Sequence, residues 1–137
     1  MMPPESAVRV LRSSEVSMPA SGKRSALTDF IDHRDGATFA TGMTVFRDCK
    51  TPWTLWYDEI LFCHRVEGTF TIIVADTAYP MGAGDFIWLP RKTKLAYVCK
   101  GTAWVLWSVA PANWREVRPQ TYDAVPGERP APRQGHE

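Results

Sequence analysis

Hydrophobic residues along the chain are grouped in short runs that alternate with turn-forming residues. The segments 37–46, 53–66 and 69–75 are rich in Thr, Val, Ile and aromatic residues, which favour strands. Apolar spacing of three and four does not persist long enough to predict a helix, and 111–117 offers at most one helical turn. Short strands separated by turns predict an all-β sandwich or barrel.

Turn-forming residues indicate where further strands begin and end. Asp76-Thr77 turns the chain, and residues 78–81 start the return strand of a hairpin with its tip near Asp76. The segment 84–90 reads Gly-Asp-Phe-Ile-Trp-Leu-Pro, which predicts a strand between a tight turn and a strand-ending proline.

Two glycines are expected to turn the chain in the same way. Gly68 is predicted to close one strand and to permit the turn into Thr69. Residues 95–99 and 102–109 are predicted to form a hairpin through Lys100-Gly101.

The two ends of the chain differ in composition from its middle. Residues 1–25 are rich in Pro and Ser and predict a flexible N-terminal arm, with room for one edge strand around 8–11. Residues 118–137 are rich in Pro with few apolar groups, which predicts a disordered tail. Residues 26–117 are expected to form one barrel domain, as the length of 137 residues suggests.

Charge and cysteine content exclude several classes of protein. The formal net charge of +1 gives no basic excess for nucleic-acid binding, and no apolar run approaches the roughly 20 residues of a membrane span. The N-terminus lacks the apolar stretch of a signal peptide. Cys49, Cys63 and Cys99 are an odd number without C-x-x-C spacing, which favours a reducing cytoplasm over a disulfide scaffold or a structural zinc site.

The strand between breakers carries a resemblance to a fold family. Gly84, five residues and Pro90 match the second part of the general cupin pattern, in which a histidine then follows. Leu95 stands at the position of that histidine. The resemblance implies a single cupin (RmlC-like jelly-roll) barrel of two antiparallel sheets.

The first part of the cupin pattern is only partly present. Glu59 takes the place of its glutamate, whereas Trp53 and Leu55 stand where it has two histidines. Trp and Leu side chains cannot ligate a metal, and a catalytic metal normally needs about three protein ligands. A standard cupin metal site is therefore not expected, although a divalent metal held in another way stays open.

Two uncommon sequence motifs resemble the signatures of a cupin subfamily. Residues 52–60 read P-W-T-L-W-Y-D-E-I and residues 110–114 read A-P-A-N-W, both similar to signatures of the ethanolamine-utilisation protein Q (EutQ) family. The resemblance covers roughly 40–115 and implies a role in amine or aldehyde metabolism and a homodimer. The stretch from Glu59 to Gly68 is about two residues longer than the family pattern, which predicts a β-bulge near Cys63-His64-Arg65.

Glu59 is the first candidate for chemistry, as a general base or as part of an amine or metal site. Burial among aromatic side chains would raise its pKa and suit it to proton transfer. Strand alternation is expected to place Tyr57 with Glu59 on one face and Asp58 on the other. His64 is a further candidate base or ligand. Each of these residues also has a purely structural interpretation, as an ion-pair partner or a packed polar group.

A pocket is expected at one mouth of the barrel. Trp53, Trp88, Trp104 and Trp107 form either an aromatic box for a cationic amine or simply barrel core. Lys94 belongs to a basic loop, 91–94, that either binds an anionic ligand or is merely solvated. The predicted lining consists of Trp53, Leu55, Tyr57, Glu59, Trp88 and Leu95.

Three functions fit these observations. The first is a EutQ-like protein that binds a small metabolite of amine or aldehyde metabolism. The second is an isomerase, lyase or kinase-like enzyme in which Glu59 acts as base with Tyr57 or His64. The third is a scaffold module, which predicts an exposed apolar patch. A Gly-rich phosphate loop is absent from the sequence, so a nucleotide site of the usual kind is not expected.

Overall fold

The computed structural model describes residues 8–12, 25–120 and 122, and nearly all of its ordered elements are strands. In chain order these elements are β1 (Ala26–Ile31), the 3-10 helix η2 (His33–Asp35), β2 (Ala40–Thr54), β3 (Asp58–Val74), β4 (Thr77–Met81), β5 (Phe86–Leu89) and β6 (Lys94–Ala110). The predicted all-β class is confirmed. Among the described residues no helix is long and apolar enough to cross a membrane.

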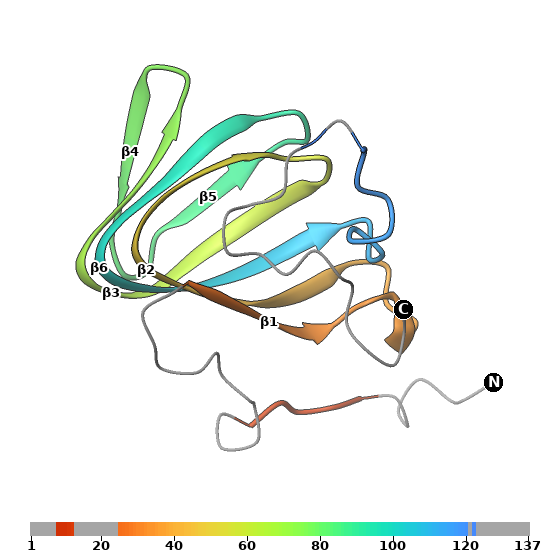
Figure 1. The fold of residues 1–137 in the computed structure, drawn as a ribbon. Helices are drawn as coiled ribbons and strands as arrows, with labels where there is room; N and C mark the ends of the chain where they lie inside the picture. The colour runs from red at the N-terminus through yellow and green to blue at the C-terminus, as the bar shows by residue number, and fades with distance from the viewer. Residues whose placement is uncertain (1–7, 13–24, 121, 123–137) are drawn as a thin grey trace.

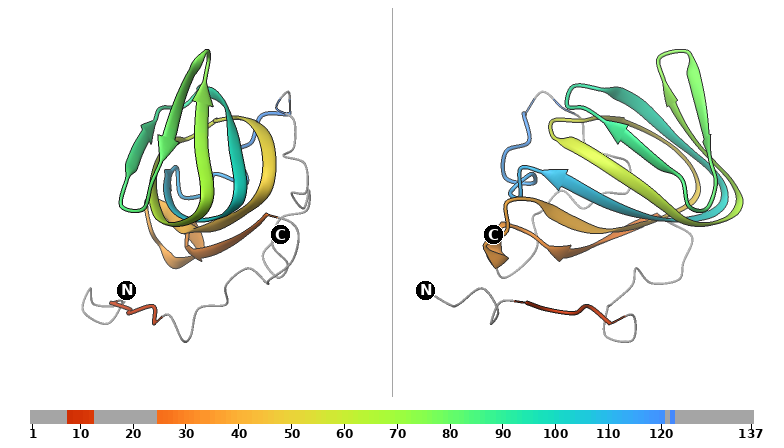
Figure 2. Two further views of the ribbon diagram at one scale, coloured as in Figure 1. Left: turned by 90° about the vertical axis from the view of Figure 1, so that its left-hand side faces the viewer. Right: turned by 180° about the vertical axis from the view of Figure 1, so that it is seen from behind.

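The strands form one antiparallel arrangement that folds over itself. Their order is β1-β2-β6-β3-β4, and β5 pairs with β3 on the side of that path. β2, β3 and β6 are 15 to 17 residues long and curve round, so that the first half of each lies opposite its second half (Figure 1). Figure 2 shows from two further directions that these curved strands enclose a common interior.

Gly68 and Gly101 lie within strands rather than at turns, so both predictions about them are wrong. β3 and β6 continue through them, and the two glycines are direct partners in the β3–β6 ladder. Their φ angles are 104° and 95°, which side chains disfavour. A Cβ atom on Gly68 would lie 2.0 Å from the Lys100 carbonyl oxygen, and one on Gly101 would lie 2.1 Å from the Glu67 oxygen. The glycines therefore bend two paired strands together.

β2 bends beside them through a bulge. The β2–β6 register shifts between Arg47 and Cys49, and the intervening Asp48 has a φ of 38°. The Asp48 carboxylate accepts a hydrogen bond of 2.7 Å from the Gly101 backbone N–H, which fixes the bend of β2 to the bend of β6.

Every second side chain of the long strands points into the interior, and both halves of each strand contribute. Leu61 and Val105 point inward from one half, and Phe70 and Ile72 point inward from the other. The Phe46 ring packs on the Phe70 ring with 5.0 Å between centroids. The predicted hairpin tip near Asp76 is confirmed, because Val74 pairs with Thr77. β5 confirms the predicted strand within 84–90.

The edge strand of the first half is β1 and not the segment around 8–11. Residues 8–12 form no strand, although Arg9 pairs with Asp35 at 2.9 Å. η2 begins after Asp32, whose carboxylate accepts from the Arg34 backbone N–H, and it ends at Gly36. The predicted tail, 118–137, lies mostly outside the described residues.

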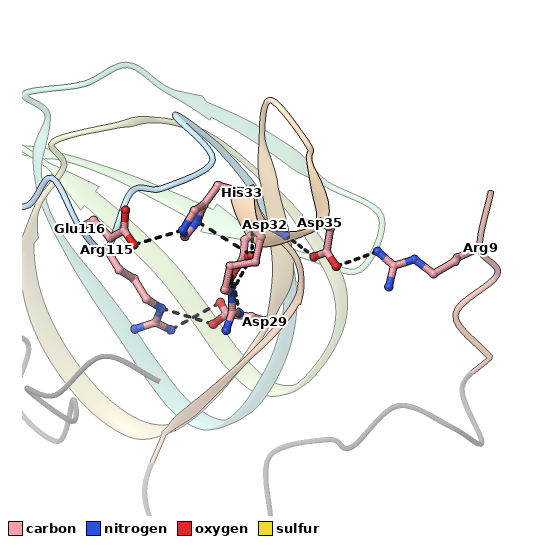
Figure 3. A network of polar contacts seen from close by, with 8 residues as sticks. Arg9, Asp29, Asp32, His33, Asp35, Arg115 and Glu116 are labelled. Carbon is pink, nitrogen blue, oxygen red and sulfur yellow. Dashed lines mark hydrogen bonds and ion pairs between the residues drawn. The ribbon is translucent and has the colours of Figure 1, made fainter. Parts of the chain in front are cut away.

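Polar side-chain contacts hold the segment after β6 against this edge. Figure 3 shows Arg115 facing Asp29 of β1, with 3.3 Å between Nε and Oδ2, and His33 facing Glu116 at 3.1 Å. The Glu116 backbone N–H donates a hydrogen bond to the Asn113 oxygen, which forms a turn but no helix within 111–117.

Candidate functional site

Glu59 lies in the interior and not in solvent. It is the second residue of β3 and points inward beside Leu89 of β5, with an exposed fraction of 5%. The Tyr97 hydroxyl donates a hydrogen bond of 3.3 Å to Glu59 Oε1. Burial raises the pKa of Glu59 to about 8, against a smaller lowering effect of the Tyr97 hydrogen bond. At neutral pH this carboxyl group is therefore mostly protonated.

Tyr97 reaches Glu59 from the opposite half of the fold. It lies on β6 between Thr51 of β2 and Ile72 of β3, whereas Glu59 lies on the half that pairs with β5. Burial and the Glu59 charge hold the pKa of Tyr97 well above its usual value. The bends at the paired glycines bring the two halves together, and so create this contact between residues 38 apart in sequence.

Trp53 and Tyr57 form a second buried contact. The Trp53 Nε1–H donates a hydrogen bond of 2.7 Å to the Tyr57 hydroxyl. The prediction that Tyr57 lies on the same strand as Glu59 is wrong, because β2 ends at Thr54 and β3 begins at Asp58. It is nevertheless buried, and its charge contributes to the raised pKa of Tyr97. Tyr57 and Glu59 are thus linked through Tyr97, whose pKa the charges of both residues raise.

Two leucines complete the apolar surroundings. Leu55 and Leu95, which stand at cupin histidine positions, are both buried. Leu55 is fixed in the link between β2 and β3, because its backbone N–H bonds the Thr93 oxygen and its own oxygen accepts from Lys92. Leu95 pairs with Trp53 across β2 and β6. Among the residues of the predicted pocket lining, Glu59 alone has a carboxyl group.

An aromatic cap lies over the Tyr57 side of the cluster. The Trp114 ring contacts Tyr57 with 5.2 Å between centroids and Trp107 with 5.7 Å. The Trp56 Nε1–H donates a hydrogen bond of 2.6 Å to the Trp114 carbonyl oxygen. The contacts of Arg115 with Asp29 and of Glu116 with His33 hold this segment in place (Figure 3).

The four tryptophans proposed as an aromatic box do not come together. Trp53 and Trp107 are buried inside, whereas Trp88 is 60% exposed and Trp104 is half-buried on the outside. Alternation explains the difference, because Ile87 and Leu89 take the inward positions of β5. The prediction that Trp88 lines the interior is therefore wrong.

His64 and Lys94 also lie away from the cluster. The predicted bulge is present, since the β3–β6 register shifts between Cys63 and Arg65, and His64 is the unpaired and exposed residue in it. Lys94 is exposed at the start of β6. In the basic loop that precedes it, Arg91 forms an ion pair with Asp58.

Comparison with known proteins identifies the family. The sequence model of the family described as "Ethanolamine utilisation protein EutQ" matches residues 8–116. The chain belongs to the EutQ family. Its similarity to "Acetate kinase EutQ" of Salmonella typhimurium is 30% identity over 91 residues, which is 66% of this chain and 39% of that protein. To the protein of the same name from Clostridioides difficile it is 26% identical, over 63% of this chain and 54% of that one.

Solved structures confirm the cupin fold. The putative ethanolamine utilization protein Q from Salmonella typhimurium LT2 matches with a TM-score of 0.69 and 25% identity, covering 80% of this chain and 90% of that chain. An RmlC-like cupin from Shewanella frigidimarina matches with a TM-score of 0.63 and 14% identity, over 78% and 94% of the two chains. The chain thus spans about two fifths of the length of the first curated EutQ relative.

In this EutQ-family chain, sequence reasoning missed Tyr97 as a site residue. A signal was present, because alternation from the predicted pocket residue Leu95 places Tyr97 on the same face. The prediction of a hairpin at Gly101 led away from this contact, because such a hairpin would not bring residue 97 opposite residue 59. Trp114, which the sequence analysis noted only within the segment 110–114, is the second residue that the structure adds.

The residues around Glu59 do not fit the metal that cupins commonly hold. Its neighbours offer one phenol hydroxyl, Tyr97, within hydrogen-bonding distance, together with leucine and tryptophan side chains. In the part of the chain that the structure describes, no three His, Cys, Asp or Glu side chains gather as metal ligands. We therefore derive no chemistry through a metal at this site.

Proposed function

We propose that this EutQ-family chain is a cupin that binds a small metabolite of ethanolamine-type amine or aldehyde metabolism, without the usual cupin histidines. The observation that carries the proposal is the contact between Glu59 and Tyr97 inside an apolar, aromatic interior. We also propose a cytoplasmic location, which rests on the number and spacing of the cysteines.

The chemistry of the cluster suits a small ligand that both donates and accepts hydrogen bonds. A protonated Glu59 carboxyl can donate through its hydroxyl and accept through its carbonyl oxygen, and Tyr97 can do the same. Buried polar groups need partners, so a ligand that lacks such groups would be rejected. Because the cluster is buried, we expect the ligand to enter when the segment that carries Trp114 moves.

Direct binding tests this proposal. Ethanolamine, acetaldehyde and acetate are titrated into the protein, and binding is followed by NMR chemical shifts and calorimetry. At least one probe is expected to bind, and Glu59→Leu is expected to weaken it by at least about tenfold, because the hydrogen-bonding carboxyl group is lost. Asp58→Asn is the matched control, since Asp58 is the adjacent strand residue on the outer face and should leave the affinity unchanged.

Two results would contradict it. Binding that is equally strong in Glu59→Leu would place the ligand elsewhere on the protein. Saturating amounts of all three probes without any shift at residues of the cluster would remove the support for this class of ligand.

A second function is favoured by the raised pKa of Glu59. A carboxyl group with a pKa of about 8 is matched to proton transfer near neutral pH, so Glu59 could serve as a general base or acid with Tyr97 beside it. Such a group could serve in isomerisation, in lyase chemistry or in kinase-like transfer. Since the curated relatives are named acetate kinases, acetyl phosphate formation from acetate and ATP is the first assay. Turnover that is lost in Glu59→Gln and kept in Asp58→Asn would support the enzyme, whereas equal rates in both variants would contradict it.

A further inference from the structure

Two of the three cysteines of the chain lie directly opposite each other on neighbouring strands. Cys49 of β2 is the register partner of Cys99 of β6. Both side chains are on the inner face, since Cys49 alternates with the buried Thr51 and Trp53 along β2, and Cys99 is 2% exposed. The third cysteine, Cys63, is buried on β3. All three are free thiols.

The register places the two opposed thiols within reach of a disulfide bond. Partner residues on antiparallel strands have Cα atoms about 4.5–5.5 Å apart, and disulfides span Cα separations of roughly 4.4–6.8 Å. The Cβ atoms of such partners are about 4.5–5.5 Å apart, whereas a relaxed disulfide holds them at roughly 3.8 Å. A bond between Cys49 and Cys99 therefore requires a small approach of the two strands. The resulting strain makes the bond easier to reduce than a relaxed disulfide.

The two thiols differ in exposure, which gives their oxidation an order. Cys49 is half-buried, whereas Cys99 is buried and its Sγ lies 3.6 Å from the carbonyl oxygens of Phe46 and Gly101. Burial raises the pKa of Cys99 to about 11, and the charge of the nearby Cys49 adds to the rise. The thiolate is the reactive form, so Cys99 is a poor first nucleophile. Cys49 is therefore the thiol that an oxidant reaches first.

The cysteine pair lies at the start of a free edge of β2. In the described part of the chain, residues 49–54 pair with β6 alone, because β1 pairs with β2 only at residues 41–45. The inner face of this edge carries Thr51, which is the partner of Tyr97, and the buried Trp53. The edge is therefore one wall of the interior, and only one neighbouring strand holds it.

We propose that Cys49 and Cys99 form a reversible disulfide that clamps this edge of β2 to β6 under oxidising conditions. A low-molecular-weight disulfide, such as oxidised glutathione, is the oxidant. The Cys49 thiolate attacks one sulfur atom of the oxidant, which forms a mixed disulfide and releases one small thiolate. Cys99 then loses its proton and attacks the Cys49 sulfur, which releases the second small thiolate. The protein gives up two protons and two electrons, and the oxidant becomes two thiols.

The bond would strengthen a link between β2 and β6 that already exists at the bend. The Asp48 carboxylate, next to Cys49, accepts a hydrogen bond from the Gly101 N–H, two residues from Cys99. With both links in place, the edge should open less often. In a reducing compartment the pair is expected as two thiols, and transient disulfides there are typical of redox-responsive sites. The inference goes beyond the proposed binding function and does not depend on it.

Mass spectrometry of the full chain after incubation with oxidised glutathione tests the proposal. The wild type is expected to lose two hydrogen atoms, and tryptic digestion without reductant should give peptide 48–50 linked to peptide 95–100. Excess dithiothreitol should restore both thiols. Cys63→Ser is the matched control and should form the same bond. Cys49→Ser should form no disulfide within the chain, and Cys99→Ser should stop at a mixed disulfide on Cys49.

Hydrogen exchange measures the clamp itself. The protected amides of residues 50–54 should exchange at least about tenfold more slowly in the oxidised protein, whereas those of β4, the other edge, should not change. Circular dichroism shows whether each variant is folded, and Cys99→Ala repeats the test with a second side chain. A disulfide between other cysteines or between two copies would overturn the proposal, as would exchange at residues 50–54 that oxidation leaves unchanged.

Discussion

Gly68 of β3 and Gly101 of β6 pair with each other at the point where both strands bend. The two residues approach so closely that neither has room for a Cβ atom, since each would meet a backbone oxygen of the other strand. A bend made by one strand alone would break its ladder. Because both strands bend at paired positions, the hydrogen-bonded ladder continues from one half of the fold to the other.

Substitution of either glycine is expected to be severely destabilising. Gly68→Ala or Gly101→Ala should lower the free energy of unfolding by about 3 kcal/mol or more, because a Cβ would lie about 2 Å from a backbone carbonyl oxygen and φ is positive. Urea denaturation measures the loss. Gly84→Ala is the control, because Gly84 also has a positive φ but its Cβ would meet nothing within 4 Å, so its loss should be smaller.

The stability of the protein should depend on pH through Glu59. Its pKa is about 8 when folded and near 4.5 when unfolded, so between these values the folded state binds more protons. This contribution to stability is complete below pH 4.5 and is lost as pH rises toward 8, by up to about 1.4 kcal/mol per pH unit. The difference in unfolding free energy between wild type and Glu59→Gln isolates it. A difference that stays constant across this range would contradict the assignment.

Removal of the Tyr97 hydroxyl should shift the titration of Glu59 upward. The hydrogen bond from Tyr97 favours the ionised carboxylate and lowers its pKa, so in Tyr97→Phe the pKa should rise further above 8. Carbon-13 NMR of the labelled glutamate carboxyl group measures it directly. Tyr79→Phe removes an exposed hydroxyl on β4, away from the interior, and should leave the pKa of Glu59 unchanged. A fall of the pKa in Tyr97→Phe would show that the hydroxyl acts in another way.

The ion pair between Asp29 and Arg115 should matter more than the exposed pair at Asp58. The Asp29 side chain is only 3% exposed, so Asp29→Asn leaves the Arg115 charge without its buried partner and should cost about 3 kcal/mol of unfolding free energy. Arg91→Ala removes an exposed pair and should cause no measurable loss. Chemical denaturation of the two variants side by side decides between these outcomes. Equal losses would mean that Arg115 finds another partner when Asp29 is changed.

Much of the site was accessible from the sequence because its residues stand in a recognisable pattern. Glu59, Leu55 and Leu95 were predicted as inward residues from their cupin positions, and all three are buried. The predicted effect of burial on the pKa of Glu59 has the right direction. The bulge at His64 was predicted from the length of the segment before Gly68, and the shift of register confirms it.

The two wrong predictions of turns have a common origin in how glycine was interpreted. A glycine flanked by strand-forming residues can end a strand or bend it, and local sequence does not distinguish these outcomes. Two turns were predicted at Gly68 and Gly101, but the partner strand supplies hydrogen bonds on both sides of each glycine and keeps the strands continuous. The placement of Trp88 failed for a related reason. Outward and inward faces were assigned without knowing the register of β5 against β3.

The sequence by itself determined the all-β class, the positions of most strands and the presence of one carboxyl group in an apolar strand, because these depend on local composition and alternation. Only the tertiary structure decided which groups meet. The Glu59–Tyr97 contact joins residues from two strands, and the cap by Trp114 joins the segment after β6 to the link between β2 and β3. Such contacts depend on where long strands bend and in what register they pair, and those are properties of the whole ladder and not of any one segment.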